Sequence, residues 1–334
     1  MRYMLMGLGG SALCNLLMGA ATAYPAMLAI WAVNAAFQSM LWTPVMRIVA
    51  LHFREEDTRL RANAIIALAL TFGHLGAWAV SGYLASLVGW RFSFFTPGVL
   101  ALMAIAVSGL FLRGISTRGN AAPKAAARQQ GGAPILRVFT GTGFFFVLAG
   151  CLLYGFIRDG VVTWTPTLLS RLGTSAVSAT AFTLILPLLN SAGVIIGFGL
   201  RKRGSNPHIV VVMMMAAAIF CGTALLLQQG MLLTAVLLGL ICAGMYGANT
   251  MLTGLIPLEY DRVGKTGLTA GLIDSLIYAG SAFAGAAGGS LYETMGARAL
   301  YMAWIAAAVL AAVFMRTSAS MSTRYWKAKE NPRA

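Results

Sequence analysis

The stretch Gly155-Phe156-Ile157-Arg158-Asp159-Gly160-Val161-Val162-Thr163-Trp164-Thr165-Pro166 places two charged residues inside a long apolar run. An ionisable side chain within a membrane helix costs several kcal/mol, so such residues are rare and usually face a partner or a wet cavity. The stretch predicts a transmembrane helix. It also predicts that Arg158 lines a path through the membrane and attracts an anion.

The composition extends this prediction to the whole chain. Of the 334 residues, 59% are hydrophobic and 10% are charged, and the mean hydropathy is +0.78. These values lie outside the range of soluble globular domains. The net charge of +15 would suggest a nucleic-acid partner in a soluble protein, but here the basic residues lie between apolar runs, where they set membrane orientation. We expect contact with membrane lipids and none with nucleic acid.

Ten apolar runs are long enough to cross a hydrocarbon core of about 30 Å, which takes about 20 helical residues. They cover residues 4–22, 25–50, 63–86, 92–112, 141–169, 176–200, 207–227, 231–255, 265–289 and 297–316. The first run lacks the flanks of a cleaved signal peptide, so we expect it to remain as a span. The predicted fold class is an all-α polytopic membrane protein.

Metal and nucleotide chemistry has little support in the sequence. The cysteines occur singly in apolar runs, without the paired spacing of a zinc site or a disulfide framework, at Cys14, Cys151, Cys221 and Cys242. No phosphate-binding loop of the Gly-x-x-x-x-Gly-Lys-Ser/Thr type occurs, which argues against ATP-driven pumping. We expect no metal and no cofactor.

The basic residues predict an orientation. Segments on one side of the expected membrane hold 19 of the 24 lysines and arginines, whereas the other side holds only Arg91, Arg171 and Arg298. By the positive-inside rule both termini should be cytoplasmic, in the inner (cytoplasmic) membrane of the cell. Arg47 lies near the cytoplasmic end of its run and is expected to serve this topology by reaching the headgroups.

A polar, Gly-rich and basic segment, residues 113–140, reads as a cytoplasmic linker. Four runs precede it and six follow. The expected domains are an incomplete N-terminal bundle (1–112), the linker, a six-helix C-terminal bundle (141–316) and a basic cytoplasmic tail (317–334). Many transporters consist of two halves of six helices. The 4+6 layout is that plan with two helices absent from the front.

Small residues recur at helix-packing spacing in the second part of the chain. The pairs are Gly193 with Gly197, Gly267 with Gly271, and Gly285 with Gly289. Such pairs let membrane helices approach one another closely. They predict a tightly packed bundle and carry no information about a substrate.

Four motifs resemble those of the organophosphate:phosphate antiporter branch of the major facilitator superfamily, which includes the glycerol-3-phosphate and hexose-phosphate antiporters. Residues 37–47 (FQSMLWTPVMR) resemble the signature of its fourth helix, and residues 158–166 (RDGVVTWTP) resemble the Arg-x-Gly and Trp-x-Pro pattern of its seventh. Tyr246-Gly247 and residues 269–280 (TAGLIDSLIYAG) are similar to its tenth and eleventh helices.

The resemblance implies a major facilitator fold that lacks the first two helices. Residues 1–3 would then follow the place of the superfamily's Gly-x-x-x-Asp-Arg loop, and the binding arginine of the first helix would have no counterpart. The equivalent loop of the second half, residues 197–204, keeps the basic residues but lacks the acidic one. We therefore expect Arg158 to stand alone as half of a site.

Arg158 is the leading candidate for a substrate-binding residue. A guanidinium offers a fork of donors that matches phosphate or carboxylate. The alternative is an arginine paired inside the bundle with Asp159 or Asp274, two residues that are also candidates for proton coupling. Adjacent helical residues point about 100° apart, so Asp159 is expected to be badly placed to neutralise its neighbour.

Two further ionisable residues lie within predicted spans. Asp274 is near the middle of run 265–289 and should be paired, protonated or in a wet cavity. Proton coupling and a static pair with Arg158 both remain open, and the resembled antiporters have no acid at this place, which leaves room for a proton-coupled carrier. His74 lies midway along run 63–86, in the helix where the family has a binding histidine. It suits anion contact, proton exchange or a helix–helix hydrogen bond.

Four uncharged polar residues are expected to line the path. Tyr246 and Tyr278 match cavity-facing tyrosines of the resembled branch, with packing of a satisfied hydroxyl as the alternative. Asn249 follows Tyr246 by three residues and should share its helical face. Gln38 shares a helical face with Trp42, four residues later, and we expect Trp42 to be structural.

The predicted function is secondary active transport of a small organic anion, with a phosphate ester as one option, by alternating access. Antiport and proton coupling are both open. A non-transporting membrane sensor of the same fold is the alternative. With two helices absent, the chain is expected to transport poorly alone or to be inactive. We expect a monomer, and no enzyme, because the helices carry no paired catalytic constellation.

Overall fold

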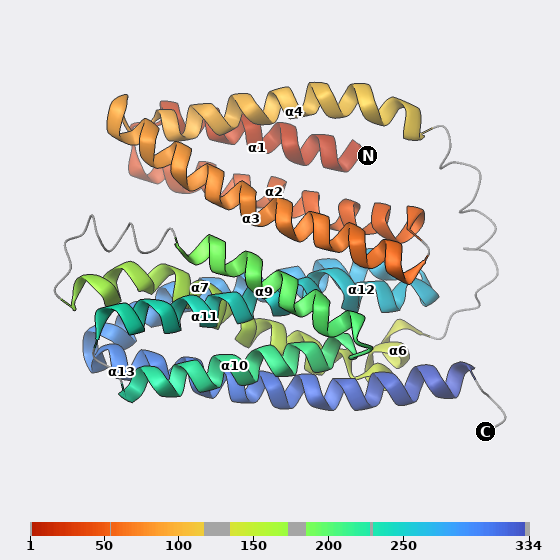
Figure 1. Cartoon of the computed structure of the whole chain (residues 1–334). Coiled ribbons are helices and arrows are strands. Elements are labelled where there is room, and N and C mark those ends of the chain that lie inside the picture. The colour runs from red at the N-terminus through yellow and green to blue at the C-terminus, as the bar shows by residue number, and fades with distance from the viewer. Residues whose placement is uncertain (1, 54, 117–133, 173–184, 228–229, 331–334) are drawn as a thin grey trace. The chain divides into compact units, whose positions relative to one another are not determined.

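The computed structural model describes residues 2–53, 55–116, 134–172, 185–227 and 230–330 (Figure 1). Helices are the regular elements of these ranges, and no strand occurs within them. Eight of the described helices are long and apolar enough to cross a membrane. The expected all-α, polytopic fold class is confirmed.

The first part of the chain forms four helices, each overlapping one of the expected apolar runs. They are α1 (Arg2–Ala20), α2 (Tyr24–His52), α3 (Glu56–Leu87) and α4 (Phe92–Ser116).

The second part contains the helices that carry most of the candidate site. They are α6 (Ile135–Thr142), α7 (Phe144–Ser170), α9 (Ile185–Lys202), α10 (Pro207–Leu227), α11 (Met231–Asn249), the π-helical segment η2 (Thr250–Leu255), α12 (Ile256–Glu259), the 3-10 turn η3 (Tyr260–Val263) and α13 (Thr266–Glu330). Part of the expected run 176–200 falls on residues 173–184 and lies outside the described residues.

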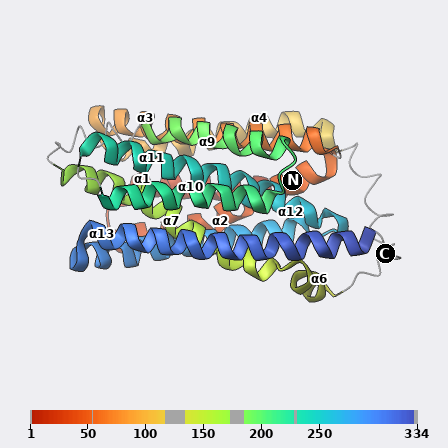
Figure 2. The ribbon, with the colours of Figure 1, turned by 60° about the horizontal axis from the view of Figure 1, so that its bottom comes forward.

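Apart from residue 265, the last two expected spans both lie in α13. Gly296 interrupts this helix with a φ of 76°, a conformation that glycine adopts without the steric cost of a Cβ atom. We call residues 266–295 the first rod of α13 and residues 297–330 its second rod. The second rod runs along α10 and ends at the C-terminal end of the described chain (Figures 1 and 2).

By their contacts, the described residues divide into two units. Unit 1 contains those within Met1–His52, Phe72–Gly132 and Asp261–Gly271, and unit 2 contains those within Phe53–Thr71, Ala133–Tyr260 and Leu272–Ala334. In unit 1, α1 contacts both α2 and α4 (Figure 1). The buried Ser11 hydroxyl donates to Asn34 Oδ1 at 2.8 Å and joins α1 to α2.

In unit 2, α7 packs against α11 and against both rods of α13. Gly155 of α7 faces the backbone of Ile277, and Gly280 of the first rod faces the backbone of Leu152, so these two helices touch backbone to backbone. Gly150 of α7 faces Met315 of the second rod. Close approach at small residues is the usual way in which membrane helices gain packing energy.

The segment η2 widens the helix that begins as α11. Its wider turn leaves backbone carbonyls that threonine hydroxyls contact: Thr250 Oγ1 donates to Gly247 O at 2.7 Å, and Thr253 Oγ1 donates to Asn249 O at 3.0 Å. Such π-helical turns occur mostly as single interruptions of α-helices and often near functional sites.

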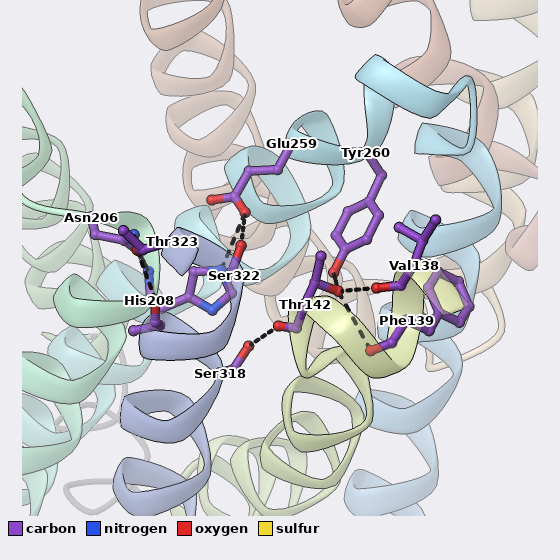
Figure 3. Close-up of polar contacts among 11 residues, drawn as sticks. Val138, Phe139, Thr142, Asn206, His208, Glu259, Tyr260, Ser318, Ser322 and Thr323 are labelled. Carbon is purple, nitrogen blue, oxygen red and sulfur yellow. Dashed lines mark hydrogen bonds and ion pairs between the residues drawn. The ribbon is translucent and has the colours of Figure 1, made fainter. Parts of the chain in front are cut away.

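The last turns of α13 dock on three other elements of unit 2 through polar contacts (Figure 3). Ser318 Oγ donates to the carbonyl oxygen of Thr142 at 3.4 Å, and Ser322 Oγ donates to Glu259 Oε2 at 3.1 Å. Glu259 Oε2 also lies 3.4 Å from Nε2 of His208, a histidine with 0% of its side chain exposed. These contacts tie the second rod directly to α6 and α12, and to α10 through Glu259.

We expect Ser322→Ala to loosen these last turns, because the variant removes a hydrogen bond to a carboxylate that is 22% exposed. A bond of this kind contributes about 1 kcal/mol, which corresponds to a roughly fivefold rise in local opening. Hydrogen exchange of a peptide covering residues 315–330 measures the effect. Thr317→Ala is the matched control, since among the described residues the Thr317 hydroxyl bonds only to Val313 O of its own helix. Equal exchange in the two variants would contradict the expectation.

Candidate functional site

Arg158 and Asp159, which lie near the middle of α7, form a two-point fork. Arg158 Nε donates to Asp159 Oδ1 at 2.7 Å, and Nη2 donates to Oδ2 at 2.8 Å. The side chains are 15% and 32% exposed. The expectation that Asp159 is badly placed is wrong, because three methylene groups and a planar guanidinium reach across the 100° between neighbouring positions. The Asp159 carboxylate is therefore the counter-ion of Arg158, and the charge of Arg158 is not unpaired.

The first rod of α13 also holds Asp159. Ser281 Oγ lies within hydrogen-bond distance of Asp159 Oδ2. Its second acceptor is Ile277 O, at 3.0 Å. Ser281 follows Gly280, the residue at which this rod touches α7. The close helix contact thus brings the serine to the carboxylate.

On the side of Arg158 facing α11, Tyr154 and Asn249 complete the cluster. The Tyr154 hydroxyl lies 3.0 Å from Met245 O and 3.1 Å from Asn249 Oδ1, and Arg158 Nη1 lies 3.5 Å from the same Oδ1. The guanidinium carbon is 5.5 Å from the centre of the Tyr154 ring, a cation–π distance. Tyr154 is not among the site residues predicted from the sequence. Its place four residues before Arg158, one helical turn away, is the signal that could have found it.

Asp274 is a half-buried carboxylate on the first rod of α13. It lies close enough to Arg158 for the two charges to interact. Among the described residues it makes no hydrogen bond and no ion pair. The structure therefore does not contain the static pair with Arg158 that was one of the two expectations.

Tyr246 and Tyr278 belong to the same neighbourhood. Both lie within electrostatic reach of Arg158, Tyr246 half-buried on α11 and Tyr278 62% exposed on the first rod. Six expected site residues therefore gather in unit 2 from α7, α11 and α13, namely Arg158, Asp159, Tyr246, Asn249, Asp274 and Tyr278.

Gln38 and His74 belong to unit 1. Gln38 lies on α2 and His74 on α3, and both residues are exposed on their unit. Their contact with a substrate stays a prediction. For metals, no group of three or more histidine, cysteine, aspartate or glutamate residues with binding geometry occurs in the part of the chain that the structure describes.

Comparison with known proteins identifies the class. The sequence profile of the Major Facilitator Superfamily matches residues 1–284, so the chain belongs to this superfamily. It is a multi-pass membrane transporter and not an enzyme. A search of curated protein sequences finds no match.

The solved structures agree on the fold. The chain is similar to the major facilitator transporter FucP in the outward conformation, with a TM-score of 0.73 and 14% identity over 95% of this chain and 82% of that chain. It is also similar to a variant of the E. coli fucose:proton symporter FucP, with a TM-score of 0.69 and 15% identity over 95% and 83% of the two chains. At such identities the likeness concerns the fold.

Proposed function

We propose that this chain transports a small organic anion by alternating access, with the Arg158 guanidinium as the anion anchor. The observation that carries the proposal is the fork between Arg158 and Asp159 in the middle of a membrane helix. A guanidinium that binds one carboxylate through two parallel bonds can bind a carboxylate or phosphate of a substrate in the same way. The substrate anion and Asp159 then compete for the same donors of the Arg158 guanidinium.

The charge balance favours coupling to protons. Arg158 contributes one positive charge, and Asp159 and Asp274 contribute up to two negative charges. Adding an anion to this poorly solvated cluster is costly unless a carboxylate takes up a proton. Asp274 is the better candidate, since the described residues give it no hydrogen bond, and exchange against a second anion is the alternative mode.

Several finer statements belong to the same proposal. The motifs in residues 37–47 and 158–166 support the organophosphate:phosphate antiporter branch and a phosphate ester as substrate. The distribution of lysine and arginine supports a cytoplasmic location of both termini in the inner membrane. We further propose that the protein acts as a monomer.

Arg158→Ala tests the anchor role. In proteoliposomes loaded with inorganic phosphate, we expect exchange of external labelled phosphate or glycerol 3-phosphate to fall about 30-fold or more, because a charge-assisted pair is worth roughly 2–3 kcal/mol. Arg158→Lys should rescue it only in part, because an ammonium lacks the planar fork. Arg171→Ala, at the exposed end of the same helix, is the matched control. Unchanged anion exchange in Arg158→Ala would contradict the proposed anchor role.

A second candidate function follows from the same fork. Because Asp159 already neutralises Arg158, the second candidate function is transport of a neutral polyhydroxylated solute together with a proton. Counterflow of a labelled neutral sugar, with no anion exchange, would favour that function. Absence of any transport by reconstituted protein that still binds an anion would favour a sensor.

A further inference from the structure

Tyr154 is a fully buried polar residue to which the proposed function gives no task. It has 0% exposure, and its hydroxyl faces two acceptors on α11, Met245 O at 3.0 Å and Asn249 Oδ1 at 3.1 Å. A tyrosine hydroxyl carries one proton, so it can satisfy these acceptors only in turn or by sharing. The side chain therefore bridges α7 to the point where α11 passes into η2.

The geometry around Asn249 determines how its side-chain amide is turned. Arg158 Nη1 approaches the same atom of Asn249 as the Tyr154 hydroxyl does, at 3.5 Å. Arginine has donors and no acceptor, so the atom that faces it is the amide oxygen, an assignment that rests on the hydrogen-bond network. The amide nitrogen must then point away from α7.

The Asn249 amide nitrogen is available to a ligand. No hydrogen bond to another described residue involves it, and it is not one of the buried polar atoms that lack a partner, so it reaches accessible space. With the amide in this orientation, two N–H groups of Asn249 stand beside the guanidinium of Arg158. The guanidinium and these two N–H groups are all donors, which suits a phosphate or carboxylate group that offers only acceptors and that replaces Asp159 on the guanidinium.

We infer that Tyr154 is a positioning residue, which locks the Asn249 side chain so that its N–H groups face the transport path beside Arg158. This inference rests on the proposed function, since it supplies the second half of the anion site at Arg158. Without the hydroxyl, the Asn249 amide can rotate by about 180° and present its oxygen to the substrate anion, which is repulsive. Tyr154 acts through Asn249 and does not touch the substrate.

Tyr154→Phe is the sharpest test, because phenylalanine keeps the ring below Arg158 and creates no cavity. Using inorganic phosphate as the probe in proteoliposome exchange, we expect the KM to rise about fivefold to tenfold and the maximal rate to change less than about twofold. Asn249→Ala should raise the KM by a similar factor. The double variant should be no worse than the single variants, because each of them already removes the same positioned amide.

Tyr260→Phe is the matched control. Tyr260 is also fully buried in unit 2, and its hydroxyl shares one hydrogen bond, 2.8 Å long, with Thr142, away from the cluster at Arg158 (Figure 3). Both substitutions remove one buried hydroxyl, so both should lower the apparent Tm to a similar degree. Only Tyr154→Phe should change the KM.

The outcomes distinguish a failure of this inference from a failure of the proposed function. If the KM effects of Tyr154→Phe and Asn249→Ala multiply, or if the maximal rate falls while the KM is constant, the inference is overturned. If Arg158→Ala leaves phosphate exchange intact, the proposed function fails instead. If the wild-type protein does not exchange phosphate, the same cycle is measured as apparent Tm without ligand. Non-additive losses then support the bond between Tyr154 and Asn249, and additive losses overturn it.

Discussion

Gly155→Ala is expected to prevent stable assembly of unit 2. A Cβ atom at Gly155 would overlap the carbonyl oxygen of Ile277, and a Cβ atom at Gly280 would overlap the carbonyl oxygen of Leu152 in the reciprocal contact. Both obstacles are backbone atoms of packed helices, which cannot rotate away as a flexible side chain can. The helices α7 and α13 must therefore separate along their length, and the variant loses packing on both sides.

Overpacking of a core usually costs about 1–3 kcal/mol, and a backbone overlap lies at or above the upper end. We expect the apparent Tm in detergent to fall by about 10 °C, by the usual scaling for a chain of this size, or the protein to aggregate during purification. The shift also withdraws Ser281 from Asp159. Size-exclusion chromatography and thermal unfolding measure the outcome.

Gly199→Ala is the control for the Gly155 variant. Gly199 lies in α9, and a Cβ atom there would meet no atom of the described residues within 4 Å. Alanine is a better helix former than glycine, so this variant should be neutral or slightly stabilised. If Gly155→Ala kept the wild-type Tm to within about 2 °C, the close contact between α7 and α13 would be contradicted.

Asp274→Asn is expected to abolish proton-driven accumulation while anion exchange persists. The asparagine mimics a carboxyl group that is permanently protonated, so the cluster keeps the charge that admits an anion but can no longer release a proton. In proteoliposomes with an imposed pH gradient, accumulation of labelled phosphate should drop to the level set by equilibration, a change of roughly 10-fold per pH unit for one coupled proton. Exchange without a gradient should fall less than about threefold.

Glu293→Gln is the matched control for the Asp274 variant. Glu293 lies on the same rod of α13, on the exposed side of the chain. The control should accumulate phosphate as the wild-type protein does. Gradient-driven accumulation that survives Asp274→Asn would remove Asp274 from the coupling step and leave Asp159 as the remaining carboxylate of the cluster.

The sequence predicted those features of the fold that depend on a single physical property. Hydropathy predicted the membrane helices, and the spacing of Gly193 and Gly197 predicted a close helix contact: both glycines face the backbone of α11, at Ala243 and Gly247. The same spacing rule was wrong at Gly285, where a Cβ atom would meet nothing within 4 Å in the part of the chain that the structure describes. Spacing identifies a small-residue face but does not identify its partner.

The polar cluster was predicted only in part. The cost of charge in a membrane pointed to Arg158, Asp159 and Asp274, and their helices bring them together. The direction of the Cα–Cβ bond does not predict where an arginine guanidinium lies, because the long side chain can fold back on its neighbour. The fork between Arg158 and Asp159 was therefore not predicted. Tyr154 was not predicted as a site residue, because a single tyrosine in an apolar run is equally compatible with simple packing.

The π-helical segment η2 lies between Asn249, which belongs to the site, and Glu259, which the end of α13 contacts. It changes the direction in which the site residues of α11 point relative to Glu259. A π-helical turn accommodates one extra residue, and one residue corresponds to about 100° of rotation. Asn249 and Tyr246 are thus offset in direction from where an unbroken α-helix ending at Glu259 would place them. The terminal turns of α13 hold Glu259 through Ser322, while the amide of Asn249 takes its direction from two residues of α7, Tyr154 and Arg158.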